Sequence, residues 1–190
     1  MRHSKGKIIL AYTLKSEYMR EYKVRPAEHG DAVAIALIAK QSWNHTYGSI
    51  YPKEVIRKFV SEAYSIERLH GSISRDSERP VRLFHVALDS ERNLAGYSQT
   101  LPCPDRKGAY DLARIYALPG TIGTGVGAAL LNHLLLKCTD ITELSAWVEE
   151  RNTQGRRFYE KHGFKVSGGK ETELFGFRTR ELRYSLIRHS

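Results

Sequence analysis

One glycine-rich stretch carries residues whose types and spacing suit a specific chemistry. Residues 112–131 read LARIYALPGTIGTGVGAALL, with glycine at 123, 125 and 127 directly before an apolar helical pattern. Glycine lacks the Cβ atom that holds a ligand away from the backbone, and the first N–H groups of a helix have no partner within it. Because the helix dipole also attracts negative charge, the stretch predicts a phosphate-binding loop.

Two familiar phosphate-binding patterns do not account for this loop. The Walker pattern requires Gly-Lys-Ser/Thr, whereas Gly127 precedes two alanines. The dinucleotide pattern GxGxxG/A is met formally by Gly123, Gly125 and Ala128, but it belongs to the first turn of repeated βαβ units. Here it follows an expected β-hairpin deep in the chain. A flexible glycine turn that binds nothing is the alternative interpretation.

A second segment, NTQGRRFYEKHGF over residues 152–164, has the pattern of a short capped helix. Asn152 is a good N-cap residue, and Tyr159 follows it by about two helical turns, so the two residues lie on nearly one face. Gly163 suits the left-handed residue that ends a helix. Taken alone, Tyr159 would be interpreted as a packed aromatic residue with its hydroxyl at the surface.

Together the two segments resemble the GNAT superfamily of acetyl-CoA-dependent N-acetyltransferases, over about residues 22–187. The loop is similar to the family's pyrophosphate signature Q/R-x-x-G-x-G/A, with Gly125 and Gly127 at the glycine positions, and the second segment is similar to its N…FYEKxGF pattern. Ile122 stands where the family has Gln or Arg, so backbone N–H groups must provide most of the pyrophosphate binding. Within the family, the chain is similar to PaiA-type polyamine acetyltransferases.

The resemblance implies a ternary complex in which an amine attacks the thioester of acetyl-CoA directly. The pantetheine arm would pair with one strand as an added strand, and a backbone N–H there would stabilise the oxyanion. Tyr159 would act as the general acid for the leaving thiolate. The residues expected to bind acetyl-CoA are Ile115, Tyr116, Ala117, Gly123, Thr124, Gly125, Val126, Gly127, Ala128, Asn152 and Tyr159.

The attacking amine must first lose a proton. A primary amine with a pKa near 10.4 is protonated at pH 7, and reaching the free base costs about 4–5 kcal/mol. A carboxylate can accept that proton, directly or through water. The candidates are Asp111 and Glu149, with Glu150 beside the latter; Trp147 stands where some protein-acetylating relatives have glutamate. Glu149 and Glu150 can equally be solvated charges at the end of a strand.

The acceptor is expected between the early helices and the far edge of the sheet, lined by Trp43, Tyr47 and Tyr51. The resemblance favours a polyamine or another small amine; protein or peptide amines, antibiotics and amino acids are the alternatives. A polycation would require an acidic patch, for which the candidates are Glu62, Glu67, Asp111, Glu149 and Glu150. The alternative from a different class is a non-catalytic CoA- or nucleic-acid-binding module on the same fold.

Strand and helix patterns alternate around these segments. A strand is expected over residues 22–25, and a helix that begins at Asp31 is expected to bury Val33, Leu37, Ile38 and Trp43. Further helices are expected over residues 52–60, 65–74, 125–138 and 152–162, and further strands over 81–88, 94–101, 110–118, 143–149 and 181–187. We predict an α/β fold with a GNAT-type central twisted mixed sheet and helices on both faces. Residues 19–190 would form one domain, preceded by an appendage over residues 1–18.

The composition of the chain bears on its ligands, its location and its partners. The chain has 190 residues, and 30 Lys and Arg against 21 Asp and Glu give a net charge of +9, which indicates anionic ligands. No apolar run approaches the roughly 20 residues needed to cross a bilayer. Two cysteines and eight histidines show no disulfide framework or metal-binding spacing, so we expect no metal and a cytoplasmic protein. We expect no membrane partner and no nucleic acid, and the assembly is open between monomer and homodimer.

Overall fold

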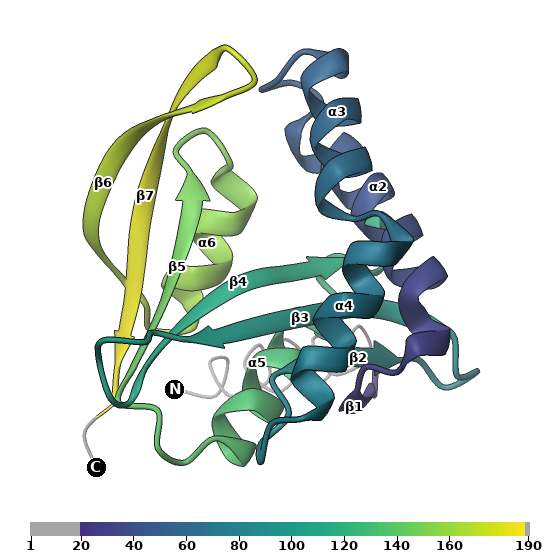
Figure 1. The fold of residues 1–190 in the computed structure, drawn as a ribbon. Coiled ribbons are helices and arrows are strands. Elements are labelled where there is room, and N and C mark those ends of the chain that lie inside the picture. Colours follow the sequence, from purple (N-terminus) through teal and green to yellow (C-terminus); the bar gives the residue numbers. More distant parts are fainter. Residues whose placement is uncertain (1–19, 189–190) are drawn as a thin grey trace, which may run out of the picture.

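A seven-stranded sheet forms the centre of the computed structural model, which describes residues 20–188 (Figure 1). Its strands are β1 (Lys23–Pro26), β2 (Phe84–Leu88), β3 (Leu94–Pro102), β4 (Ala109–Ala117), β5 (Glu143–Glu149), β6 (Lys165–Leu174) and β7 (Phe177–Ile187). The helices are α2 (Ala32–Tyr47), α3 (Lys53–Ala63), α4 (Ile66–Ser77), α5 (Val126–Lys137) and α6 (Thr153–Lys161), with short 3-10 turns η1 (His29–Asp31) and η2 (Pro119–Thr121).

The sheet is mixed, as predicted, with the spatial order β1-β2-β3-β4-β5-β7-β6. The pairing of β4 with β5 is parallel, and each of the other neighbouring pairs is antiparallel. The parallel pairing is short, because only residues 109–111 of β4 pair with residues 143–145 of β5. Beyond that point β5 stays paired with β7 along its whole length while β4 stays paired with β3.

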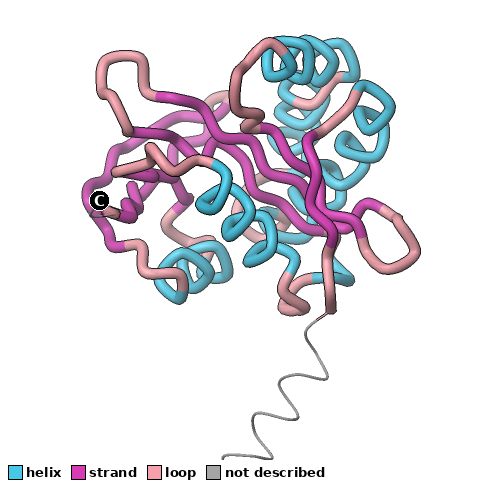
Figure 2. Tube along the Cα trace, turned by 90° about the horizontal axis from the view of Figure 1, so that it is seen from below, coloured by secondary structure: helices cyan, strands magenta, loops and turns pink. Residues whose placement is uncertain are grey.

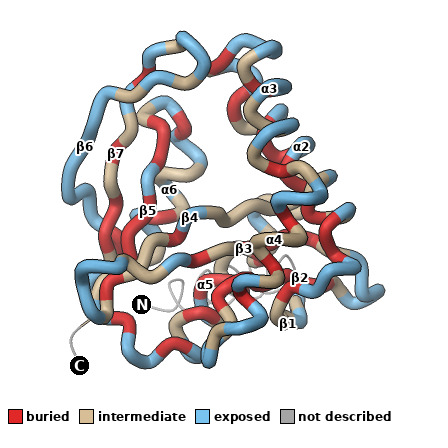
Figure 3. The backbone as a smooth tube through the Cα atoms, viewed as in Figure 1, coloured by how far each residue is buried: buried red, intermediate tan, exposed pale blue. Residues whose placement is uncertain are grey.

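Helices cover both faces of the sheet, which confirms the predicted architecture (Figure 2). On one face α2, α3 and α4 pack against β2 and β3 through residues such as Ile35, Phe84 and Tyr97. On the other face α5 and α6 pack through residues such as Leu134 and Leu144. The buried residues follow these two layers, whereas β6 is largely exposed at the sheet edge (Figure 3).

The first helix buries a different stripe from the one predicted. Val33 and Leu37 are 70% and 52% exposed, whereas Ile38 and Trp43 are buried as expected. The helix begins with the apolar run AVAIALIA, in which several stripes are equally apolar, so helical period alone cannot select the buried one. Asp31 makes no side-chain cap bond to the helix; its carboxylate accepts hydrogen bonds from Arg25 and from the backbone N–H of Glu28.

Of the two strands in the last hairpin, only the second was predicted from the sequence. The chain forms β6 after α6, and β7 begins at Phe177 rather than at residue 181. β6 carries glycines and charges instead of an apolar alternation, because it is an edge strand with little to bury. The turn places Phe175 and Gly176 at positive φ. β2 is shorter than predicted and begins at Phe84, since the N–H of the preceding Leu83 donates to the Asp76 carboxylate.

The predicted appendage over residues 1–18 lies outside the described residues, and the division at residue 19 stays a prediction. The described chain starts beside the glycine-rich loop: the N–H of Arg20 donates to the carbonyl of Thr124, and the hydroxyls of Tyr22 and Thr124 share a hydrogen bond of 2.6 Å. Within residues 20–188, none of the helices combines the length and apolar character that a membrane span requires.

Candidate active site

A cleft opens where β4 and β5 separate. The parallel pairing ends at Asp111 and Ser145, and β4 then carries a β-bulge: Thr100 pairs with Leu112 and Gln99 with Arg114, which leaves Ala113 as the extra residue. Among the described strands, residues 115–117 of β4 therefore have no partner on the β5 side. The cleft has a volume of about 240 Å³ and includes residues 112–117 of β4 among its walls.

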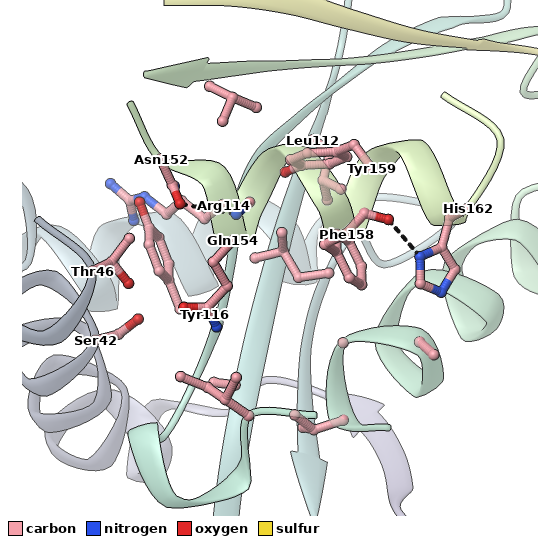
Figure 4. Close-up of a pocket in the computed structure, with 18 of the residues that line it drawn as sticks. Ser42, Thr46, Leu112, Arg114, Tyr116, Asn152, Gln154, Phe158, Tyr159 and His162 are labelled. Atoms are coloured by element: carbon pink, nitrogen blue, oxygen red, sulfur yellow. Dashed lines mark hydrogen bonds between the residues drawn. The ribbon is translucent and has the colours of Figure 1, made fainter. Parts of the chain in front are cut away.

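The cleft passes through the sheet from one helical layer to the other. On the α5 and α6 side it is lined by the glycine-rich loop and by Phe158, Tyr159 and His162; on the α2 side it is lined by Ser42 and Thr46 (Figure 4). A ligand bound at the loop can therefore extend between the strands toward α2. Two ligands could therefore occupy the cleft from opposite faces of the sheet.

The loop presents free N–H donors at the start of α5. Gly123 and Gly125 adopt left-handed φ values of 84° and 103°, which side chains rarely tolerate. Within residues 20–188, the backbone N–H groups that donate to no protein acceptor include those of Gly123, Gly125, Val126, Gly127 and Ala128. These donors and the positive end of the helix dipole make the loop a binding site for an anion.

Thr124 differs from its neighbours in the loop. Its N–H donates to the carbonyl of Thr121, its carbonyl accepts from Arg20, and it does not line the cleft. Thr124 therefore joins the loop to the start of the described chain. The predicted cofactor residues Ile115, Tyr116 and Ala117 do line the cleft.

Close packing holds the two helices that border the loop. A Cβ atom built on Gly127 would lie 2.9 Å from Cε2 of Phe158, which is closer than real Cβ contacts come. The glycine therefore lets α5 approach α6 at the point where both line the cleft. Ile122, at the position of the signature's Gln or Arg, also lines the cleft.

Asn152 caps α6 as predicted and also contacts α2. Its side-chain oxygen accepts from the N–H of Gly155 at 2.9 Å, and its amide nitrogen donates to the hydroxyl of Tyr47 at 3.3 Å. Asn152 and Tyr47 both line the cleft. The cap thus connects the walls of the cleft across the gap between the strands.

Tyr159 lies in the cleft with its ring enclosed by other aromatic residues. The ring contacts Phe164 at 5.2 Å and stacks on Tyr184 at 5.8 Å between centroids, and Figure 4 shows it beside Leu112. Burial raises the pKa of Tyr159 above the ordinary value for tyrosine, with a smaller contribution from Tyr47. The phenol therefore keeps its proton at neutral pH and is a suitable proton donor.

The two predicted bases lie outside the cleft lining. The carboxylate of Asp111 accepts a hydrogen bond from the hydroxyl of Ser145 at 2.6 Å, at the point where β4 and β5 separate. Glu149 is buried and accepts from Thr179 and from both the backbone N–H and the Nε of Arg151. Glu150 forms an ion pair with Arg180 at 3.3 Å.

The predicted acceptor residues form one aromatic cluster, of which Tyr47 lines the cleft. Trp43 is buried against Tyr47 and Phe59, with ring centroids 4.3 and 4.1 Å away, which is a packing role. Tyr51 meets Phe177 of β7 at 5.3 Å, so the α2–α3 turn contacts the last hairpin. Burial raises the pKa of Tyr47.

Several lining residues were not predicted from the sequence. They come from α2, β4 and α6, and they are Ser42, Thr46, Arg114, Gln154, Lys161 and His162. Arg114 lies within the strand that the pattern identified, but its side chain faces the side opposite the loop, which a strand period does not reveal. No carboxylate is among the lining residues in the described chain, and residues 20–188 contain no group of His, Cys, Asp or Glu arranged for a metal.

The sequence profile of the Acetyltransferase (GNAT) family matches residues 41–164. The chain belongs to the GNAT family of acetyltransferases. The match spans the glycine-rich loop and the capped α6 segment, so the family predicted from those residues is confirmed. GNAT structures with a similar fold include the crystal structure of PaiA N-acetyltransferase from Thermoplasma acidophilum in complex with coenzyme A, with a TM-score of 0.74, 26% identity, and coverage of 88% of this chain and 99% of that one.

Two further GNAT relatives extend the comparison. The spermidine N(1)-acetyltransferase of Thermoplasma acidophilum is 28% identical over 146 residues, which cover 76% of this chain and 88% of that protein. The YncA structure from Salmonella typhimurium, solved with its cofactor acetyl-CoA, has a TM-score of 0.69 at 18% identity and covers 90% of this chain and 96% of that one. At that identity YncA supports the fold alone.

Proposed function

We propose that this chain transfers an acetyl group from acetyl-CoA to a primary amine by direct attack in a ternary complex. The observation that carries the proposal is a set of five N–H groups at the start of α5 that have no acceptor within residues 20–188, in a cleft that the Tyr159 side chain also lines. The two features supply an anion site and a proton donor in one passage through the sheet.

The residues that line the cleft provide groups that would bind the diphosphate and the pantetheine arm of coenzyme A. The loop donors would bind the diphosphate, and Lys161, which also lines the cleft, would supply the positive charge that Ile122 does not. Residues 115–117 of β4 would pair with the pantetheine amides, since this stretch has no strand partner on the β5 side. When bound, acetyl-CoA supplies an acetyl group activated as a thioester.

Residues near the thioester would stabilise the negative charge that develops on the carbonyl oxygen and supply a proton to the departing sulfur. Unpaired N–H groups of β4 next to the Ala113 bulge would stabilise negative charge on the carbonyl oxygen. The Tyr159 hydroxyl would hold the proton that the departing sulfur requires, because burial keeps the phenol protonated. Asn152, bonded to Gly155 and Tyr47, would keep the start of α6 in place.

The amine proton would leave through water, because no carboxylate lines the cleft in the described chain. Of the two predicted bases, Asp111 has the freer carboxylate, since Ser145 is its hydrogen-bond donor in the described structure, whereas Glu149 binds three donors. We assign the proton acceptor to Asp111 and a supporting role to Glu149, whose bonds fix the end of β5 to β7.

A thiol-release assay tests the proposal. The full chain is mixed with acetyl-CoA and a panel of amines that includes spermidine, the substrate named for the Thermoplasma relative, and lysine peptides. We expect free thiol in stoichiometric proportion to acetylated amine. Acetyl-CoA binding without thiol release for any acceptor would contradict the proposal and favour the non-catalytic alternative. Nucleic-acid binding, which the net charge of +9 would favour, should instead weaken steeply with salt.

A further inference from the structure

A second groove runs between α4 and the sheet, on the helical layer opposite the glycine-rich loop. It lies over residues 99–101 of β3, and its charged lining residues are Arg68, Arg75, Arg79, Arg114, Glu67 and Asp76. Gly71 and Ser72 also line it, and the Arg75 guanidinium lies against both, donating to the Ser72 hydroxyl at 3.4 Å. Four guanidinium groups thus meet two carboxylates, an excess of two positive charges.

The four arginines are not used for ion pairs within the described chain. None of them forms a salt bridge with a carboxylate of residues 20–188. Asp76 is already engaged by Arg82 at 2.8 Å and by the N–H of Leu83. The effective imbalance is therefore larger than the residue types suggest, because Glu67 is the one remaining acid in the groove.

Arg114 connects this groove to the cofactor cleft, because it lines both. It follows the Ala113 bulge in β4, its guanidinium lies 4.6 Å from the centre of the Tyr64 ring, and its Nη2 donates to the carbonyl of Ala63. Stacking and this bond fix the group while leaving other N–H donors available. An acceptor that approaches the thioester position from the α4 side must pass Arg114.

We propose that the acceptor amine carries an anionic oxygen group, a carboxylate or a phosphoryl group, which the arginine groove binds. This inference rests on the proposed function and specifies its substrate class. Guanidinium groups bind such oxygens through paired N–H donors, whereas a polyamine would bring further positive charge to four arginines. The cleft itself offers a polycation no carboxylate among its described lining residues.

Pairs of related acceptors that differ in charge test whether the negative charge matters. Glutamate is compared with glutaminamide, in which both carboxylates are replaced by amides, and phosphoethanolamine is compared with ethanolamine. Activity is followed as thiol release from acetyl-CoA, with spermidine as the polycation. We expect kcat/KM to be at least about tenfold higher for the anionic member of a pair at low salt, and the advantage to shrink as salt screens the charges. The carboxylate and phosphoryl pairs show which oxygen group the groove prefers.

Variants of the groove arginines test whether the preference for anionic acceptors depends on this groove. The double variant Arg68→Gln/Arg75→Gln should lower kcat/KM about tenfold for the anionic acceptors and leave the neutral ones unchanged. Arg57→Gln is the control, since Arg57 is exposed on α3 and lines neither the groove nor the cleft. Preference for spermidine or for the neutral members, unaffected by the double variant, would overturn the inference.

A binding measurement distinguishes a failure of this inference from a failure of the proposed function. Calorimetry with glutamate and phosphoethanolamine is carried out on the protein saturated with coenzyme A. Binding that weakens in the double variant, without thiol release, would support the groove while refuting catalysis on these amines. Thiol release from other amines, with no binding of either anion, would refute the groove and leave the acetyltransferase intact.

Discussion

The side-chain amide of Asn152 donates a hydrogen bond to the hydroxyl of Tyr47 at 3.3 Å, which joins the start of α6 to the last residue of α2. The two residues are far apart in the sequence, and both line the cleft between the strands. One side chain therefore caps α6 and connects it to α2 across the cleft. Its removal should affect stability and binding together.

Asn152→Ala should lower the free energy of unfolding by about 1 kcal/mol, the usual cost of losing an N-cap, and should also weaken the binding of coenzyme A. Chemical denaturation and calorimetry with coenzyme A measure the two effects. Ser65→Ala is the matched control for coenzyme A binding, because Ser65 caps α4 through the N–H of Arg68 and lines the arginine groove rather than the cofactor cleft. The control should lose similar stability with normal affinity for coenzyme A; equal affinity in both variants would remove Asn152 from the site.

Tyr159→Phe should lower kcat by about a hundredfold or more, the contribution of a general acid, while the affinity for coenzyme A stays the same. The phenylalanine ring preserves the packing against Phe164 and Tyr184. Because burial raises the pKa of Tyr159, the wild-type rate should keep rising up to about pH 9 as the amine loses its proton. Full turnover in the variant would exclude the hydroxyl from proton transfer.

Asp111→Asn should lower kcat/KM by about a hundredfold at pH 7, and the loss should shrink at high pH, where the amine is already a free base. Glu149→Gln should instead lower stability, because its three donors lose a charged acceptor. The pH profile of kcat/KM for both variants decides between them. A pH-independent loss in Asp111→Asn, with a recoverable loss in Glu149→Gln, would reverse the two assignments.

His85 makes the fold sensitive to acid. It is buried in β2, and its Nδ1 has no hydrogen-bond partner within residues 20–188. Its pKa is lowered from 6.5 to about 4, mainly by burial, with further lowering by Arg82 and by His133, whose ring centroid is 4.7 Å away, against an opposing effect of Asp76. The folded state thus binds fewer protons, so this contribution, about 3 kcal/mol, is complete above pH 6.5 and is lost as pH falls toward 4. His85→Leu should flatten the fall in unfolding free energy across that window. An unchanged slope would contradict the assignment.

Local features of the site could be predicted from the sequence, and features that depend on packing could not. The loop at Gly125, the Asn152 cap and strand Glu143–Glu149 follow from residue type and spacing over a few positions. The exposure of Val33 depends on which side of α2 packs on the sheet, and the apolar run AVAIALIA at the start of that helix does not reveal it. The separation of β4 from β5 and the arginine groove could not be predicted, because each is formed by elements that are far apart in the sequence.

The proposed roles of Tyr159 and of the arginine groove both require that the N–H groups at the start of α5 bind the diphosphate of coenzyme A. Titration of the isotope-labelled protein with coenzyme A, followed by amide NMR, tests it without any acceptor. We predict selective shifts at the unpartnered amides of Gly123, Gly125, Val126, Gly127 and Ala128, and little change at Gly120, which lies outside the cleft. Saturating coenzyme A with no change at these five amides would contradict the account.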